Sequence, residues 1–167
     1  KEGNKTGTWK YYYYDGTLSE TENYKEGKID GDDISYNESG KIDRKSDYKD
    51  GELNGEVKYY GDNDQLMLVF YYKNDDLTGY SYEDKTGKLL PMLRLEKGAG
   101  TVDAYYRNGV KSAHMVFNEG VSDGERILYY SNGKEQLNVT RINGQDNGVK
   151  KIYYPDGKIM KEENYYY

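Results

Sequence analysis

The sequence predicts an all-β protein, built as an elongated single-layer array of antiparallel β-hairpins with about seven repeats of roughly 24 residues. Three features predict this fold. Glycine recurs at a nearly constant interval, the stretches between glycines are rich in tyrosine, valine and isoleucine, and polarity alternates within those stretches. The chain has 22 tyrosines and 20 glycines among 167 residues and no cysteine, so disulfides and thiolate metal sites are excluded.

Two series of glycines define the repeat. The first series marks one turn of each hairpin and comprises Gly16, Gly40, Asp64, Gly87, Gly109, Gly133 and Gly157. The second marks the other turn and comprises Gly3, Gly27, Gly51, Asp75, Gly98, Gly120 and Gly144. Turns such as Asp-Gly and Asn-Gly supply the positive φ values that hairpins need. The fifth copy departs from the pattern, with a compressed "KGAG" at residues 97–100.

Side-chain parity predicts which face of each strand is buried, since residues two apart point the same way. The expected buried sets in the second strands are Leu66, Leu68, Phe70 and Tyr72, then Leu89, Pro91, Leu93 and Leu95, then Lys111, Ala113, Met115 and Phe117. One position of the first strands is tyrosine in six copies: Tyr12, Tyr36, Tyr60, Tyr105, Tyr129 and Tyr153. We expect these tyrosines to form a ladder of stacked rings that ties the repeats together.

A central block of the chain is apolar on both strand faces. We take it as the candidate binding region, with the residues Leu66, Met67, Leu68, Val69, Phe70, Tyr71, Leu90 and Met92. A single-layer sheet that is apolar on both faces must either be covered by its own chain or meet a partner. Both alternatives, an internal curl and a partner site, are open from the sequence.

The stretches "YKEGKIDGDDISYNESGKI" and "YKDGELNGEVKYYGDNDQL" resemble MORN repeats, in particular the bacterial MORN-variant repeat. The chain is similar over nearly its whole length to the YwqK-type antitoxin-like family, as a single MORN-like repeat domain of residues 1–167. It lacks the Gly-x-Gly pair of the standard MORN unit and has Trp9 as its one tryptophan. The resemblance implies β-hairpin repeats and binding roles: protein scaffolding, membrane-lipid association and toxin neutralisation. Plant lipid kinases also carry MORN repeats, but no Gly-rich phosphate loop with a strand lysine supports a kinase here.

Composition and charge bear against several other functions. The net charge is −6 and lysines alternate with acids, which argues against nucleic acid as a partner, because nucleic acid is bound through clustered Lys and Arg. His114 is the single histidine and has no supporting nucleophile motif, so we expect a surface or partly packed residue. Acidic turns such as Asp30–Asp33 lack the spacing of calcium loops. We expect no enzyme activity, no cofactor and no metal site.

The expected function is a non-enzymatic repeat scaffold that binds another protein, with toxin neutralisation as one form. One alternative is a peripheral scaffold at an envelope or lipid surface, which requires a basic edge. Another is a carbohydrate-active or carbohydrate-binding protein, which requires a cleft. Homo-oligomers could form through the free sheet edges. The chain begins with Lys1 rather than Met, which is compatible with a removed signal peptide and favours an exported or envelope location over a cytoplasmic one.

Overall fold

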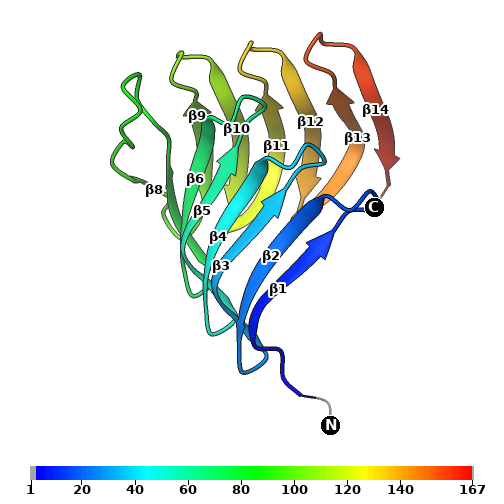
Figure 1. The fold of residues 1–167 in the computed structure, drawn as a ribbon. Helices are drawn as coiled ribbons and strands as arrows, with labels where there is room; N and C mark the ends of the chain where they lie inside the picture. The colour runs from blue at the N-terminus through cyan, green and yellow to red at the C-terminus, as the bar shows by residue number, and fades with distance from the viewer. Residues whose placement is uncertain (1–2, 167) are drawn as a thin grey trace.

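The computed structural model describes residues 3–166 and confirms an all-β fold, with fourteen antiparallel strands in two open sheets. The first sheet contains β1 (Gly7–Tyr12), β2 (Leu18–Lys25), β3 (Lys28–Tyr36), β4 (Ile42–Lys49), β5 (Glu52–Tyr60), β6 (Leu66–Lys73), β7 (Asp76–Ser81) and β8 (Leu93–Arg94). The second contains β9 (Gly100–Tyr105), β10 (Lys111–Asn118), β11 (Val121–Tyr129), β12 (Glu135–Ile142), β13 (Gln145–Tyr153) and β14 (Ile159–Tyr165). Within each sheet, strands that follow one another in the chain lie side by side (Figure 1). The described part of the chain contains no helix that could cross a bilayer.

The first glycine series closes one turn in each of the seven repeats. The amide of Gly16 donates to the carbonyl of Tyr13 at 3.0 Å, and the equivalent bond recurs through to Gly157. Asp64 stands in this series with a φ of 60°, against 88° for Gly16. The strand register shifts beside the turn, between Tyr11 and Tyr12. A turn that ends in a left-handed residue and a bulge is a common hairpin connection, which explains why glycine dominates this position.

The second glycine series forms tighter turns and joins successive repeats. Glu26 and Gly27 have φ values of 51° and 85°, the two positive angles of a type I′ turn. The amide of Gly27 donates to the carbonyl of Lys5 in the preceding hairpin at 2.9 Å. Gly98 is the exception, because its amide bonds to the carbonyl of Leu95 within its own turn. The bonds between repeats are therefore interrupted at the compressed fifth copy.

The two sheets separate at this interruption. The second strand predicted over residues 89–95 is wrong: the segment contains only the two-residue β8, and Leu93 is 44% exposed. Pro91 cannot donate a ladder hydrogen bond. The segment instead crosses closely over Gly79, where an added Cβ would lie 2.5 Å from the carbonyl oxygen of Leu93. Beyond this crossing the chain returns as the second sheet, which lies behind the first in Figure 1.

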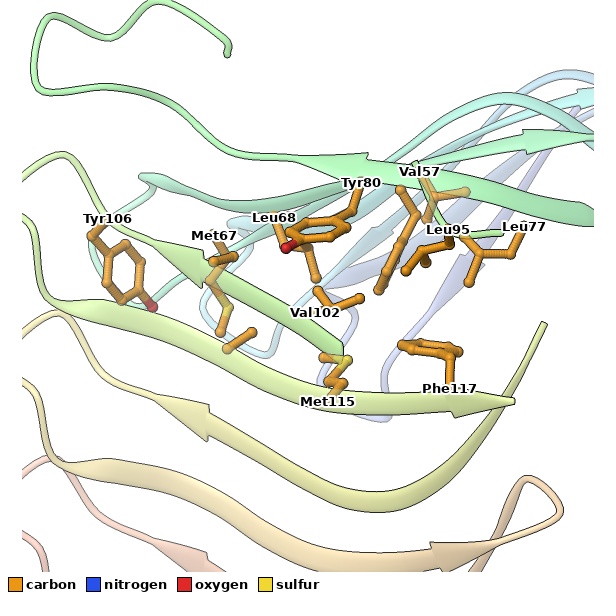
Figure 2. Close-up of a cluster of buried hydrophobic side chains, with 13 residues drawn as sticks. Val57, Met67, Leu68, Leu77, Tyr80, Leu95, Val102, Tyr106, Met115 and Phe117 are labelled. Atoms are coloured by element: carbon orange, nitrogen blue, oxygen red, sulfur yellow. The ribbon is translucent and has the colours of Figure 1, made fainter. Parts of the chain in front are cut away.

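The hydrophobic core lies between the sheets, where β5–β7 face β9 and β10 (Figure 2). Leu68 is 1% exposed, and the ring of Phe70 packs edge-on against Phe117 with the centroids 5.4 Å apart. The hydroxyl of Ser112 donates to the carbonyl of Met67 at 2.6 Å, so this buried polar group is satisfied. Burial of each large side chain contributes about 1.5–3 kcal/mol. The predicted residues Leu66, Leu68, Phe70, Ala113, Met115 and Phe117 are buried, and Tyr72 is half-buried. The prediction for Lys111 is wrong, because a register shift between Lys111 and Ala113 turns it to the outer face beside Asp103 and buries Ser112.

The tyrosines of the expected ladder make contacts different from those predicted. They end alternate strands, at Tyr12, Tyr36, Tyr60, Tyr105, Tyr129 and Tyr153. An intervening strand separates equivalent rings by about 9.6 Å, which is too far for them to stack. The next residue along the chain joins the repeats instead. The hydroxyls of Tyr13, Tyr106 and Tyr130 donate to the carbonyls of Tyr36, Tyr129 and Tyr153, respectively, at 2.6–2.8 Å.

Candidate functional site

The central apolar block is divided between core and surface. The buried part is Leu66, Met67, Leu68, Val69 and Phe70, each at most 9% exposed. Tyr71 and Leu90 are half-buried, and Met92 is 38% exposed. The chain curls so that both faces of β6 are covered, which is one of the two alternatives left open by the sequence. Of the candidate binding residues, Tyr71, Leu90 and Met92 keep surface that a partner can reach.

One face of the first sheet is buried in the core at β5 and β6 and is exposed to solvent at β1. Strand register places a row of cross-strand neighbours on this face: Phe70, Val57, Ser46, Asp33, Glu22 and Trp9. Exposure is 4% at Phe70 and 42% at Trp9, because the second sheet packs against β6 at one end of the row. We call the part of this face over β1–β4 the open inner face. It comprises Trp9, Tyr11, Glu20, Glu22, Tyr24, Asp33, Arg44 and Tyr48.

An aromatic cluster forms the β1 end of the open inner face. The Nζ atom of Lys5 lies 4.6 Å from the ring centre of Trp9 and 4.5 Å from that of Tyr24. It also bonds to the hydroxyl of Tyr11 at 2.8 Å. The hydroxyls of Tyr11 and Tyr24 donate to the Oε2 atom of Glu22 at 2.6 and 2.9 Å. The three rings thus form a pocket for an ammonium group, which Lys5 occupies, and Glu22 holds two of the ring hydroxyls in place.

Carboxylates give the rest of the open inner face its charge. The Nη2 atom of Arg44 lies 3.0 Å from Asp33 and 3.8 Å from Glu20. Burial raises the pKa of Asp33, and burial with the neighbouring Asp33 raises the pKa of Glu20. With Glu22, three acids therefore stand on this face against two cations, Arg44 and Lys5. The arrangement favours a positively charged partner.

A partly enclosed cleft of about 310 Å³ lies beside the core, between the sheets. Its apolar walls are Tyr59, Met67, Leu68, Phe70 and Tyr72 from the first sheet and Ala113, Met115, Phe117 and Leu128 from the second. Burial raises the pKa of Tyr72 to about 12. Figure 2 shows Met115 and Phe117 pointing from the second sheet toward the first.

Two arginines are the charged residues of the cleft lining. Arg126 on β11 and Arg141 on β12 share one sheet face, since Arg126 pairs with Val139 and Arg141 with Gly124. The sequence carried a signal for Arg141. It occupies the position that holds an aromatic or leucine side chain in the other second strands, as in Tyr72. Arg141 thus places a charge at a position that is aromatic or leucine in the other copies, whereas strand parity gave no such signal for Arg126.

The two arginines differ in their partners. The Nε atom of Arg141 lies 3.2 Å from Asp146, and its guanidinium donates to the carbonyl of Gly144. Asp146 is also 2.9 Å from the Nζ atom of Lys150. The Nε atoms of both arginines are buried without a hydrogen-bond partner, but only Arg141 has a carboxylate in salt-bridge range among the described residues. Burial first, and then the neighbouring Arg141, lower the pKa of Arg126.

His114 lies on the opposite face of the second sheet from the core. Its Nδ1 atom is 2.8 Å from Asp103, and its Nε2 atom is 3.7 Å from Glu125. The Nζ atom of Lys111 also lies 2.6 Å from Asp103. The side chain of His114 is 23% accessible, in keeping with a partly packed surface histidine. Across residues 3–166, no group of three or more His, Asp or Glu residues is arranged to hold a metal ion.

Three of the hairpins are similar in sequence to a known repeat family. The MORN repeat variant matches residues 5–26, 53–74 and 146–165. Three segments of the chain are therefore similar to the MORN repeat variant. The matched segments coincide with the hairpins β1–β2, β5–β6 and β13–β14, so repeats of this kind occur in both sheets. No curated protein matches the chain. Together with the regular hairpins, the MORN repeat variants fit a repeat scaffold.

Proposed function

We propose that this repeat scaffold is a non-enzymatic protein that binds another protein through its open inner face. The supporting observation is the row from Phe70 to Trp9, which passes from the core to an exposed aromatic side chain without leaving one sheet face. Tryptophan and tyrosine dominate the energetics of many protein interfaces, because they supply large rigid contact area. The face therefore extends the core chemistry onto an accessible surface.

The charges of the open inner face define the partner as a basic protein segment. Glu20 and Glu22, which are half-buried, favour Lys or Arg on the partner. The ammonium pocket of Trp9 and Tyr24 offers one defined contact, because a partner lysine can take the place of Lys5. Toxin neutralisation is one form of this proposal, in which the basic partner is a toxin and inhibition of its activity is the readout.

The test compares three immobilised proteins: the parent, Trp9→Ala and Tyr14→Ala. Trp9 lies on the open inner face, whereas Tyr14 lies in the following turn and is fully exposed, which makes it a matched aromatic control. A protein captured from the source cells is then purified and titrated against each variant by calorimetry. We expect at least tenfold weaker binding for Trp9→Ala and unchanged binding for Tyr14→Ala, as loss of a hot-spot aromatic costs about 2 kcal/mol or more.

Salt and charge provide the second arm of the test. Glu22→Gln should weaken binding and reduce its dependence on ionic strength, because the acidic face attracts the partner over a range of about 10 Å. Binding that is indifferent to both Trp9→Ala and Glu22→Gln would overturn the proposal. Pelleting with anionic vesicles at low salt, lost in Trp9→Ala, would identify a lipid surface as the ligand instead.

A further inference from the structure

The cleft between the sheets contains a cation whose counter-charge is missing among the described residues. The Nε atom of Arg126 is buried without a hydrogen-bond partner. The neighbouring carboxylate, Asp146, is engaged by Arg141 and Lys150. Leaving a buried nitrogen of a charged group without a hydrogen-bond partner is unfavourable. The protein-binding role of the open inner face does not account for this arrangement, because Arg126 lies on the other sheet.

A second guanidinium faces the same space. Arg141 is the diagonal neighbour of Arg126 on the adjacent strand, and both line the cleft. Two like charges so close repel one another, and an anion bound between them would offset this repulsion. Guanidinium groups match the planar, two-oxygen geometry of a carboxylate. The charged end of the cleft therefore suits an anion with two oxygens.

The rest of the cleft is apolar and sized for a small molecule. Tyr59, Phe70 and Met115 are among its walls, and the volume of about 310 Å³ lies at the lower end of small-molecule sites, which span about 300–1,000 Å³. Sites of this kind combine apolar walls with a few polar groups that orient the ligand. An anion without an apolar part would leave these walls uncovered.

We propose that the cleft binds a small amphiphilic carboxylate, with the carboxylate on Arg126 and Arg141 and the apolar chain or ring against Tyr59, Phe70 and Met115. A carboxylate fits this site because Asp146 is shared by Arg141 and Lys150, and no ion pair among the described residues involves Arg126. The site is separate from the open inner face and does not depend on it.

The experiment titrates the full chain with decanoate, acetate and decan-1-ol. Acetate has the charge without the chain, and decan-1-ol has the chain without the charge. We expect decanoate to bind roughly ten- to a hundredfold more tightly than either, since a hydrogen bond to a charged group contributes about 1.5–3 kcal/mol. The side-chain Nε–Hε resonance of Arg126 should shift on titration with decanoate. Equal affinity for decan-1-ol, or no shift of that resonance, would refute the site.

Variants locate the carboxylate. Arg126→Met should weaken decanoate binding about tenfold or more while keeping the fold, because a neutral side chain of similar length removes the buried charge. Arg126→Lys should weaken it less, since it retains the charge but loses the two-pronged geometry. The control is Arg94→Met, on the exposed β8 strand and outside the cleft lining. Decanoate affinity unchanged in folded Arg126→Met would overturn the assignment.

Two further experiments identify the source of the carboxylate and test whether the two proposed sites are independent. A short peptide ending in two leucines supplies the same chemistry from a chain terminus. Binding tighter than decanoate, lost on C-terminal amidation and in Arg126→Met, would identify a protein terminus as the carboxylate source. Trp9→Ala should leave decanoate affinity unchanged, so that failure of the protein-binding proposal and failure of this one are distinguishable.

Discussion

The inner faces of the two sheets use the same hairpin repeat with opposite charges. Away from the core, the first sheet places Glu22 and Asp33 on its inner face, next to the aromatic cluster. The second places Arg126 and Arg141 there, beside the apolar cleft. Close to the junction both sheets present apolar side chains, such as Phe70 and Met115.

This difference shows that the hairpin backbone does not depend on the inner side chain. The turns and the bonds between repeats involve main-chain atoms, and they recur in both sheets. Where the sheets pack most closely, as at Phe70 and Met115, the inner position is apolar, because a charge there would lose its water. Away from the junction the same position is free to carry binding chemistry.

The largest effect is expected from truncating the core end of the inner row. Phe70→Ala should lower the free energy of unfolding by about 3–5 kcal/mol, because it opens a cavity between the sheets. Glu22→Ala, in the same row, should cost less, about 1–2 kcal/mol, because it removes two hydrogen bonds to a carboxylate but opens no cavity in the core. Urea denaturation of both variants measures the contrast. An equal cost would show that the outer part of the first sheet is packed as tightly as the junction.

Tyrosine hydroxyls at equivalent turns should differ between the sheets. Tyr106 is 2% exposed and donates to the carbonyl of Tyr129 at 2.8 Å, so Tyr106→Phe should cost about 1–3 kcal/mol. Tyr13, half-buried in the first sheet, makes the same bond to Tyr36. Tyr13→Phe should cost only about 0.5–1.5 kcal/mol. Thermal unfolding of the two variants decides, and a larger loss for Tyr13→Phe would contradict the proposed role of burial.

Alkaline pH should act on the cleft wall. Burial raises the pKa of Tyr72 to about 12, above the ordinary value of 10.0, so the neutral phenol is favoured in the folded state. Its contribution to stability is complete below about pH 10 and is lost as the pH rises toward 12. Tyr72→Phe should reduce the slope of stability against pH in this window by up to about 1.4 kcal/mol per pH unit. Denaturation between pH 9 and about 11.5 measures the slope, and an unchanged slope would place Tyr72 in water.

The smallest effect is expected at an exposed salt bridge between two turns of the first sheet. Lys41 and Asp64 form a salt bridge of 2.8 Å between adjacent repeats, with both side chains roughly half exposed. Lys41→Gln should change stability by less than about 1 kcal/mol, because exposed ion pairs are screened by water and salt. Chemical denaturation at low and high salt provides the check. A loss comparable to that of Phe70→Ala would mean that repeats are joined by surface charge rather than by backbone bonds.

Much of the local structure could be predicted from the sequence, and the predictions that were wrong have identifiable physical causes. The glycine series marked the turns, and alternation marked the buried faces of β6 and β10. The strand expected at 89–95 failed because of Pro91 and the crossing over Gly79. The proximity of Arg126 to Arg141 was not predicted, because it depends on the register between β11 and β12.

The sequence by itself determined the hairpins, because a turn depends on the φ preferences of a few adjacent residues and a strand on its own side-chain alternation. The tertiary structure alone decided that the array is interrupted after β8 and folds back so that the two sheets pack together. That packing rests on contacts such as Ser112 with Met67, which are 45 residues apart, and on the ring of Phe70 against Phe117. Contacts so distant along the chain depend on how the two sheets meet, and the same meeting determines which inner residues become core and which remain open for binding.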